Sequence, residues 1–305
     1  MANKVYQIVT DRVVALLERG VVPWRKPWAG SEARPKNLAS GKQYRGINPF
    51  LLSVTAWSEG YESPYWLTFR QAKDRGGHVR KGEKATTVIF WKQYTIQERD
   101  PDTKEITAKN IPVLRAYSVF NAEQTAEVEF PQPTEAVIDF DPIERCESAV
   151  AGMPDPPKIE NLGHAAEFLR QRDTIRMPRP ERFRSAEHYY SALFHELTHS
   201  TGSDGRLARP GITEPNGFGS PEYAREELIA EMGAAFLCGH CGIEASTIED
   251  NASYLAGWIK RLRGNNQLVI RAASAGQKST DYVLRVTHDD RQSATERSVA
   301  TIGEA

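Results

Sequence analysis

Apolar residues recur every three or four positions between residues 3 and 19, which is the spacing of an amphipathic helix. Gly20 ends this pattern, and the two prolines of residues 21–28 favour an extended chain after it. Further helices are expected near residues 49–60 and over residues 65–75. The first helix is carried by Val5, Ile8, Val9, Val13, Leu16 and Leu17.

Two runs rich in β-branched and aromatic residues follow, residues 86–94 and residues 113–121, with a polar stretch between them. We expect the two runs to pair as an antiparallel hairpin. Helices and strands mixed within one segment predict a compact α+β domain over residues 1–125. Residues 126–157 are rich in proline and acidic residues, a composition typical of a linker.

Residues 158–305 predict a second, mainly helical domain, so the chain is expected to be a two-domain α+β protein. Ser220 and Pro221 mark the start of a long helix, because serine caps the first turn and proline fits within it. The expected elements are a helix-then-strand stretch at 161–177, helices at 185–201, 221–239 and 249–263, and a glycine-rich loop at 202–219.

The net charge of −1 conceals a strong asymmetry along the chain. Residues 1–92 contain 16 Lys and Arg against 7 Asp and Glu, a balance of +9, and the remaining residues carry −10. Five of the six tryptophans lie in the basic segment as well. Opposite fields on the two halves indicate that the halves have different partners.

The chain carries no signal for secretion or membrane insertion. It lacks both the apolar core of a secretory signal and a run of roughly 20 apolar residues. Its three cysteines imply no disulfide framework. Cys238 and Cys241 form a C-x-x-C that follows apolar residues, which favours buried thiols over a functional pair. We therefore expect a cytoplasmic protein without a membrane partner.

Residues 195–199 read His-Glu-Leu-Thr-His, the H-E-x-x-H pattern. Residues four apart lie on one face of a helix, so His195 and His199 can bind one metal ion. Glu196 projects about 100° around the helix and lies beside the ion, where it can accept a proton from a water molecule. This predicts a zinc site of the metallopeptidase type, with another divalent ion such as Mn²⁺ as an alternative.

The third ligand is expected on the second long helix, whose acidic residues are Glu226, Glu227 and Glu231. Glu227 and Glu231 are four apart on a stripe of small apolar residues, which favours a buried partner for both. We assign Glu227 as the ligand and Glu231 as the outer acceptor for an imidazole N–H, an order that could be reversed. Glu226 faces a more polar flank of the helix. We therefore weigh a solvated surface charge equally with a role at the metal site.

Cations and aromatic residues alternate in the basic segment, a pattern that suits single-stranded nucleic acid. Lysine and arginine neutralise phosphates, while aromatic faces stack on unpaired bases. The alternative is that the tryptophans form a core, and Trp57 and Trp91 lie in apolar periodic runs that favour this. Single-stranded DNA is the preferred partner. The candidate contacts are Trp24, Arg25, Lys26, Trp28, Tyr44, Arg45, Arg70, Arg80, Lys81 and Lys84.

Several of these strings together resemble the ArdC-like antirestriction proteins. The N-terminal resemblance is carried by Leu-Leu-Glu-Arg-Gly-Val-Val-Pro-Trp-Arg-Lys-Pro-Trp at 16–28, with residues 44–48, 66–72 and 79–83. Residues 194–202 and 223–231 look like the zincin-like peptidase domain attached to it. The resemblance implies a protein of a conjugative plasmid or mobile element that binds single-stranded DNA and shields it from host restriction. It also implies a zincin fold with Glu227 as the downstream ligand.

Two other interpretations remain open. The protein could be an active metalloprotease that uses its DNA-binding domain to find protein substrates, or a DNA-binding protein whose metal site is purely structural. Glu196 favours retained chemistry, because a structural site has no use for a proton acceptor beside the metal.

Overall fold

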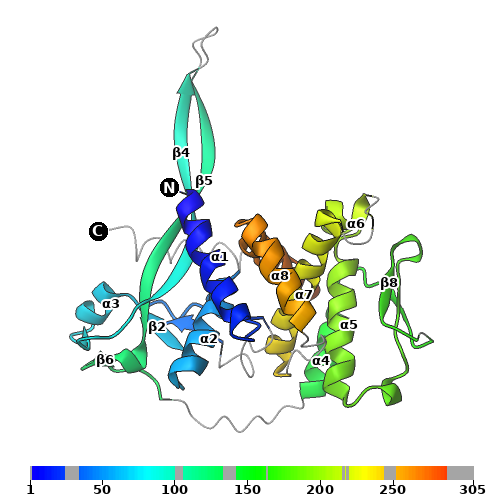
Figure 1. The fold of residues 1–305 in the computed structure, drawn as a ribbon, viewed down its shortest axis with the longest axis horizontal. Coiled ribbons are helices and arrows are strands. Elements are labelled where there is room, and N and C mark those ends of the chain that lie inside the picture. The colour runs from blue at the N-terminus through cyan, green and yellow to red at the C-terminus, as the bar shows by residue number, and fades with distance from the viewer. Residues whose placement is uncertain are drawn as a thin grey trace.

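The computed structural model describes residues 2–24, 34–99, 106–132, 142–162, 164–214, 217, 220–243 and 252–286. They form two lobes side by side, a sheet-containing lobe from the first half and a mainly helical lobe from the second (Figure 1). The expected two-domain α+β architecture is confirmed. In the described part, no helix combines the length and the apolar character that a membrane span requires.

The first lobe is built around one small mixed sheet with strand order β1-β2-β5-β4. β4 and β5 pair antiparallel over 14 residues, and the hairpin projects well beyond the body of the lobe (Figure 1). The elements are α1 (Ala2–Glu18), β1 (Lys36–Asn37), α2 (Asn48–Glu59), β2 (Tyr65–Leu67), α3 (Phe69–Asp74), β3 (His78–Val79), β4 (Thr86–Arg99), β5 (Ile106–Asn121) and β6 (Thr125–Ala126).

Local sequence accounts for the ends of these elements. Pro49 occupies the first turn of α2 and Gly60 ends the helix with a left-handed φ of 74°, a conformation that glycine adopts without strain. Thr68 caps α3 in a reciprocal capping box with Gln71. Because the expected stretch 65–75 begins with strand β2, the helix there is shorter than the sequence suggested.

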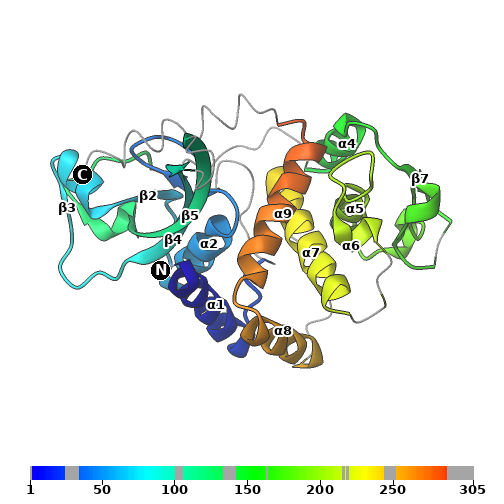
Figure 2. The same cartoon turned by 90° about the horizontal axis from the view of Figure 1, so that it is seen from above.

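The second lobe packs helices around the long central helix α7. Figure 2 shows α9 running alongside α7, with α8 across one end, and α5 also packs against α7. A three-stranded sheet of order β7-β9-β8 lies at the outer edge. The elements are α4 (Pro142–Gly152), β7 (Lys158–Glu160), β8 (Glu167–Leu169), β9 (Thr174–Arg176), α5 (Ala186–Ser200), α6 (Pro210–Thr213), α7 (Pro221–Cys241), α8 (Ala252–Gly264) and α9 (Leu268–Val283).

Three sequence expectations for this half need correction. Part of the expected linker at 126–157 is helix α4, whose Cys146 and Ala149 are buried in the core of the second lobe. In the stretch 161–177 the expected strand is confirmed as β9, but strand β8 and a single turn of 3₁₀-helix stand in place of the expected helix before it. Helix α9 was not predicted, although its apolar residues gather on one face of the helix.

The two lobes share a hydrophobic core. Val13 and Leu17 of α1 lie in one buried cluster with Ile229 and Phe236 of α7 and with Leu262 of α8. Phe50 of α2 stacks on Phe236, with 4.6 Å between ring centroids. The first lobe therefore buries part of its apolar surface against the second.

Candidate metal centre

Helices α5 and α7 bring the H-E-x-x-H residues opposite the acidic stripe. Ser185 caps α5 and Ser220 caps α7, so each helix begins where its sequence provides an N-cap. The helices approach closely because Gly233 of α7 lies against Thr198 of α5. A Cβ atom at Gly233 would lie only 2.5 Å from Thr198 Cγ2.

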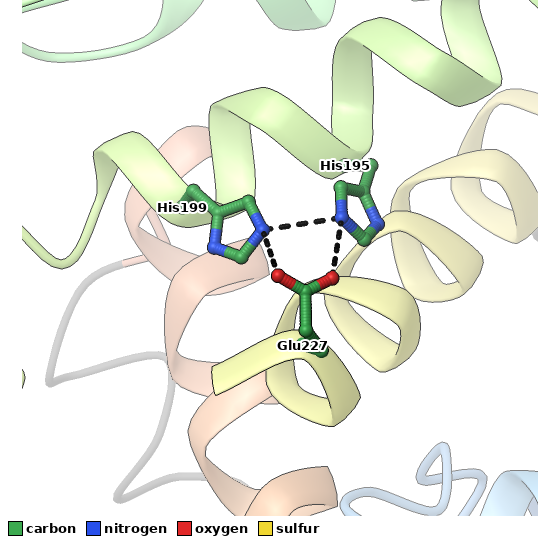
Figure 3. A group of neighbouring side chains, drawn as sticks. All are labelled: His195, His199 and Glu227. Carbon is green, nitrogen blue, oxygen red and sulfur yellow. Dashed lines mark hydrogen bonds and ion pairs between the residues drawn. The ribbon is translucent and has the colours of Figure 1, made fainter. Parts of the chain in front are cut away.

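His195, His199 and Glu227 converge on one point, with a ligand atom from each within 4.8 Å of the others (Figure 3). The two histidine Nε2 atoms are 3.1 Å apart. Glu227 places one carboxylate oxygen 3.5 Å from His195 Nε2 and the other 3.6 Å from His199 Nε2. Metal–ligand bonds of about 2.0–2.2 Å in a tetrahedral arrangement place ligand atoms about 3.3–3.6 Å apart. Each imidazole nitrogen lies at about this separation from one of the two carboxylate oxygens, so the three side chains are placed to hold one divalent ion.

The charges at this cluster are strongly coupled. Burial tends to raise the pKa of Glu227, but the hydrogen bond with His195 and the charges of both histidines outweigh it and hold the pKa at about 2. Burial tends to lower the pKa of His195, which is nevertheless raised by Glu227 and by the charges of Glu196 and Glu231. Glu227 is therefore an anion at neutral pH, as a metal ligand must be.

Glu226 lies behind His199 and is fully enclosed. Its side chain is 4% exposed and its Oε1 atom lies 3.4 Å from His199 Nδ1. Arg209 donates to the same carboxylate from Nη2 at 2.6 Å and from Nε at 3.1–3.2 Å. Burial raises the pKa of Glu226, but hydrogen bonds from His199 and Arg209 lower it overall. The suggestion that Glu226 is a surface charge is thus wrong; it orients His199 so that Nε2 faces the cluster.

Glu231 has different partners from those expected. Its Oε2 atom accepts hydrogen bonds of 2.6 Å from Trp24 Nε1 and from the Tyr254 hydroxyl. Burial raises its pKa in spite of these donors. The expectation that Glu231 accepts an imidazole N–H is therefore corrected: its side-chain donors are a tryptophan of the first lobe and a tyrosine of α8.

A cavity of about 470 Å³ opens beside the cluster. Glu196, Glu227 and Tyr223 line it together with residues of α8, among them Tyr254, Trp258 and Arg261. Burial and the neighbouring Glu227 raise the pKa of Tyr223 to about 12, so its hydroxyl keeps its proton at neutral pH. The site therefore combines a carboxylate and a neutral hydroxyl donor next to the potential ligands, on the wall of a substrate-sized space.

Two aromatic residues expected to contact DNA are buried instead, and Arg45 is half-buried. Trp24 is 2% exposed and packs edge-on against Trp258, with ring centroids 6.3 Å apart. Tyr44 is 4% exposed. Arg45 forms an ion pair with Asp281 of α9. Trp24 and Tyr44 are thus excluded as stacking residues, because their rings are enclosed by the protein.

The remaining candidates of the described part lie on the surface. The side chain of Arg70 is 61% exposed and pairs with Asp74, and that of Arg80 is 50% exposed and pairs with Glu83. Lys81 and Lys84 are exposed. Arg25, Lys26 and Trp28 lie outside the described residues.

Two tryptophans reverse the expectation drawn from their apolar surroundings. Trp57 is 60% exposed and Trp91 is 44% exposed. Burial of Trp24 and exposure of Trp57 and Trp91 show that apolar periodicity alone did not assign the core tryptophans.

Both halves of the chain match known families. Residues 3–120 match the model of the N-terminal domain of anti-restriction factor ArdC, and residues 155–275 match that of a zincin-like metallopeptidase. The protein y4eC of Sinorhizobium fredii is 33% identical, with 92% of this chain and 91% of that protein covered. The DNA primase TraC of Escherichia coli is 33% identical over 95% of this chain, which spans only 28% of the primase.

Two crystal structures of the antirestriction protein ArdC from plasmid R388 are similar along their whole length. The metal-free form is 37% identical with a TM-score of 0.70, covering 95% of this chain and 98% of that one. The Mn(II)-bound form is 36% identical with a TM-score of 0.73, covering 92% of this chain and 97% of that one.

Proposed function

The chain belongs to the family of ArdC-like antirestriction proteins, and from this we propose that it binds single-stranded DNA and protects DNA entering a cell from host restriction. We further propose that it acts in the cytoplasm and belongs to a conjugative plasmid or another mobile element. The similarity to a plasmid antirestriction protein and to a primase supports this.

The observation that carries the metal proposal is the convergence of His195, His199 and Glu227 beside a cavity. We propose that these residues hold one divalent ion. Two imidazole nitrogens and one carboxylate suit zinc, and the Mn(II)-bound relative supports manganese as the alternative. When bound, the ion would lower the pKa of a water molecule and polarise a substrate carbonyl.

The protein's own groups around the cavity suit peptide hydrolysis. Glu196 would accept the proton of the attacking water and pass it to the leaving amine. Tyr223, whose hydroxyl keeps its proton, would donate a hydrogen bond to the carbonyl oxygen as negative charge develops there. Glu226 and Arg209 would hold His199 in place throughout.

A DNA-associated peptidase is the second candidate function, and the cavity beside Glu196 is the observation that favours it. A purely structural metal site would not need an open space next to a carboxylate that is no ligand. We nevertheless propose that protection itself comes from coating of the strand, because the basic first half would hide DNA stoichiometrically.

Replacing Glu196 by glutamine tests these proposals. Glu196→Gln keeps the size of the side chain but removes its ability to accept a proton, so metal content should be unchanged and any hydrolysis lost. In a conjugative transfer assay into a restricting host, we expect this variant to protect as well as the unaltered chain. Loss of protection with full DNA binding would show instead that protection depends on cleavage of a protein.

A titration with single-stranded DNA tests the binding proposal directly. We expect the full chain to bind without sequence preference and to lose affinity as salt rises, since lysine and arginine contacts release counterions. Equal affinity at 50 mM and 500 mM salt would contradict an electrostatic interface.

A further inference from the structure

We propose that single-stranded DNA binds on the face of the β4–β5 hairpin that bears Phe90, Tyr94 and Tyr117 together with Lys92 and Arg115. This assignment rests on the proposed single-strand binding and locates it on a surface. These rings take the place of Trp24 and Tyr44 as the expected stacking residues, because the rings of Trp24 and Tyr44 are enclosed and cannot stack on bases.

The strand register places the five side chains on one face. Phe90 pairs with Arg115, Lys92 with Val113 and Tyr94 with Ile111. Alternate residues of a strand point to the same side, so these pairs share a face with Tyr117, which is paired with Val88. In the described side chains of this face, from 88 to 94 and from 111 to 117, none is acidic.

The opposite face of the hairpin is occupied by the protein itself. Ile89 and Leu114 are buried in the core shared by the two lobes. Trp91, on the same side, lies edge-on to Tyr6 of α1 with 6.4 Å between the ring centroids. The opposite face is therefore partly covered by the core and by α1, although Trp91 remains 44% exposed, whereas the face with Phe90, Tyr94 and Tyr117 combines accessible rings with two cations.

The aromatic rings of the open face are anchored at its base. Buried Tyr44 contacts Phe90 with ring centroids 6.1 Å apart, and Phe90 contacts Tyr117 at 5.7 Å. Phe90, Tyr94 and Tyr117 are half-buried, so their rings are held by the protein yet accessible. Held rings lose little freedom when bases stack on them, which favours binding.

Two cations lie against the outermost ring. Lys92 Nζ is 5.4 Å and the Arg115 guanidinium carbon 5.7 Å from the Tyr94 ring centroid. Arg115 also donates from Nη2 to the Tyr94 hydroxyl at 3.2 Å. Positive charge next to accessible rings complements a phosphate chain that carries unpaired bases, whereas duplex bases are already stacked on one another.

The length of the platform sets the number of bases it can hold. Tyr94 lies four positions after Phe90, a distance of about 14 Å along a strand. That span accommodates at most about four bases at the 3.4 Å spacing of a stacked strand. We therefore expect this face to hold a short stretch of the strand and to leave neighbouring nucleotides to the basic residues of the lobe.

Fluorescence anisotropy of the full chain with a labelled oligo-dT tests the assignment. Tyr94→Ala should weaken binding by about 5- to 150-fold, the loss expected for one stacked base. Trp57→Ala is the control, because Trp57 is a 60% exposed aromatic residue that belongs to α2 and not to the hairpin. Thermal unfolding and metal content should be unchanged in both variants.

A second measurement separates charge from stacking. The double variant Lys92→Gln, Arg115→Gln should lower the slope of log affinity against log salt by about 1.4, because each lost phosphate contact removes about 0.7 on a single strand. An unchanged slope would overturn the role of these two cations and with it the assignment.

The assignment to the hairpin and the proposed function can fail separately. If the unaltered chain does not bind oligo-dT, both the proposed single-strand binding and its location on the hairpin are wrong. If it binds and Tyr94→Ala binds equally well, or if Trp57→Ala is as damaging, only the hairpin assignment falls. Equal losses on duplex DNA would exclude base stacking, and oligomers that dissociate in Tyr94→Ala would show that a second copy of the chain covers this face.

Discussion

Glu226 and Glu227 are neighbours in the sequence and have different surroundings. One residue further along α7 is a rotation of about 100°, which separates the two carboxylates by more than a quarter turn. Glu227 faces the two histidine Nε2 atoms, and Glu226 faces His199 Nδ1 and the guanidinium of Arg209. One helix therefore supplies both a potential ligand and the acceptor that orients another ligand.

Removing Glu227 should release the metal. Glu227→Ala is expected to weaken binding of Zn²⁺ or Mn²⁺ by at least about 100-fold, the upper end of what loss of an outer partner costs. Elemental analysis by mass spectrometry after dialysis measures this. Glu222→Ala, an exposed carboxylate in the first turn of the same helix, is the control and should keep its metal. Full occupancy in Glu227→Ala would transfer the ligand role to another residue.

Removing Arg209 should destabilise the fold more than removing an exposed arginine. Arg209→Met leaves the buried carboxylate of Glu226 without its cation, which costs about 3–5 kcal/mol of unfolding free energy. Arg263→Met breaks an ion pair between exposed side chains and should cost under about 1 kcal/mol. Urea unfolding of both variants compares them, and equal midpoints would disprove a structural role for the Arg209 pair.

At the scale of elements, the metal cluster depends on how closely α5 and α7 approach. Gly233→Ala would push a methyl group into Thr198, which is buried and bonded through its hydroxyl to the Phe194 carbonyl. We expect a loss of about 1–3 kcal/mol from overpacking. Because the helices must separate, affinity for the metal should fall as well.

Gly152→Ala provides the control for this change. Gly152 is also a helical glycine, but a Cβ atom there meets nothing within 4 Å. Alanine favours helix over glycine by roughly 0.5–1 kcal/mol, so this variant should be as stable as the unaltered chain or more so. Thermal melts and metal titrations should show lower stability and weaker metal binding in Gly233→Ala than in Gly152→Ala. Unchanged stability and metal affinity in Gly233→Ala would show that α5 and α7 have room to adjust.

The sequence predicted those features whose cause is local. The spacing of His195 and His199 on one helix, the N-caps of α5 and α7, and the antiparallel hairpin all follow from residues near one another in the chain. The partner of Glu226 could not be predicted, because Arg209 follows an irregular loop whose path no periodicity encodes. Trp24 is 207 positions away from Glu231, so its burial depends on how the lobes pack.

For the whole molecule, the shared core predicts that metal binding stabilises both lobes together. Metal at about 100 times its dissociation constant should raise the unfolding free energy by about 2.7 kcal/mol. Because Val13 and Leu17 pack with residues of α7 and α8, hydrogen exchange should slow in α1 as well as in α5. Slowing confined to residues 142–286 would show that the lobes unfold independently.

The hydrogen bond between Trp24 and Glu231 restricts which first halves this chain could take in exchange for its own. A crossover between the halves that brought in a first half without this tryptophan would leave a buried carboxyl short of one donor, at a cost of about 1–3 kcal/mol. Recombinants whose junctions lie outside the segment from Trp24 to Glu231 would keep the hydrogen bond. The similarity to the primase runs through both halves of this chain.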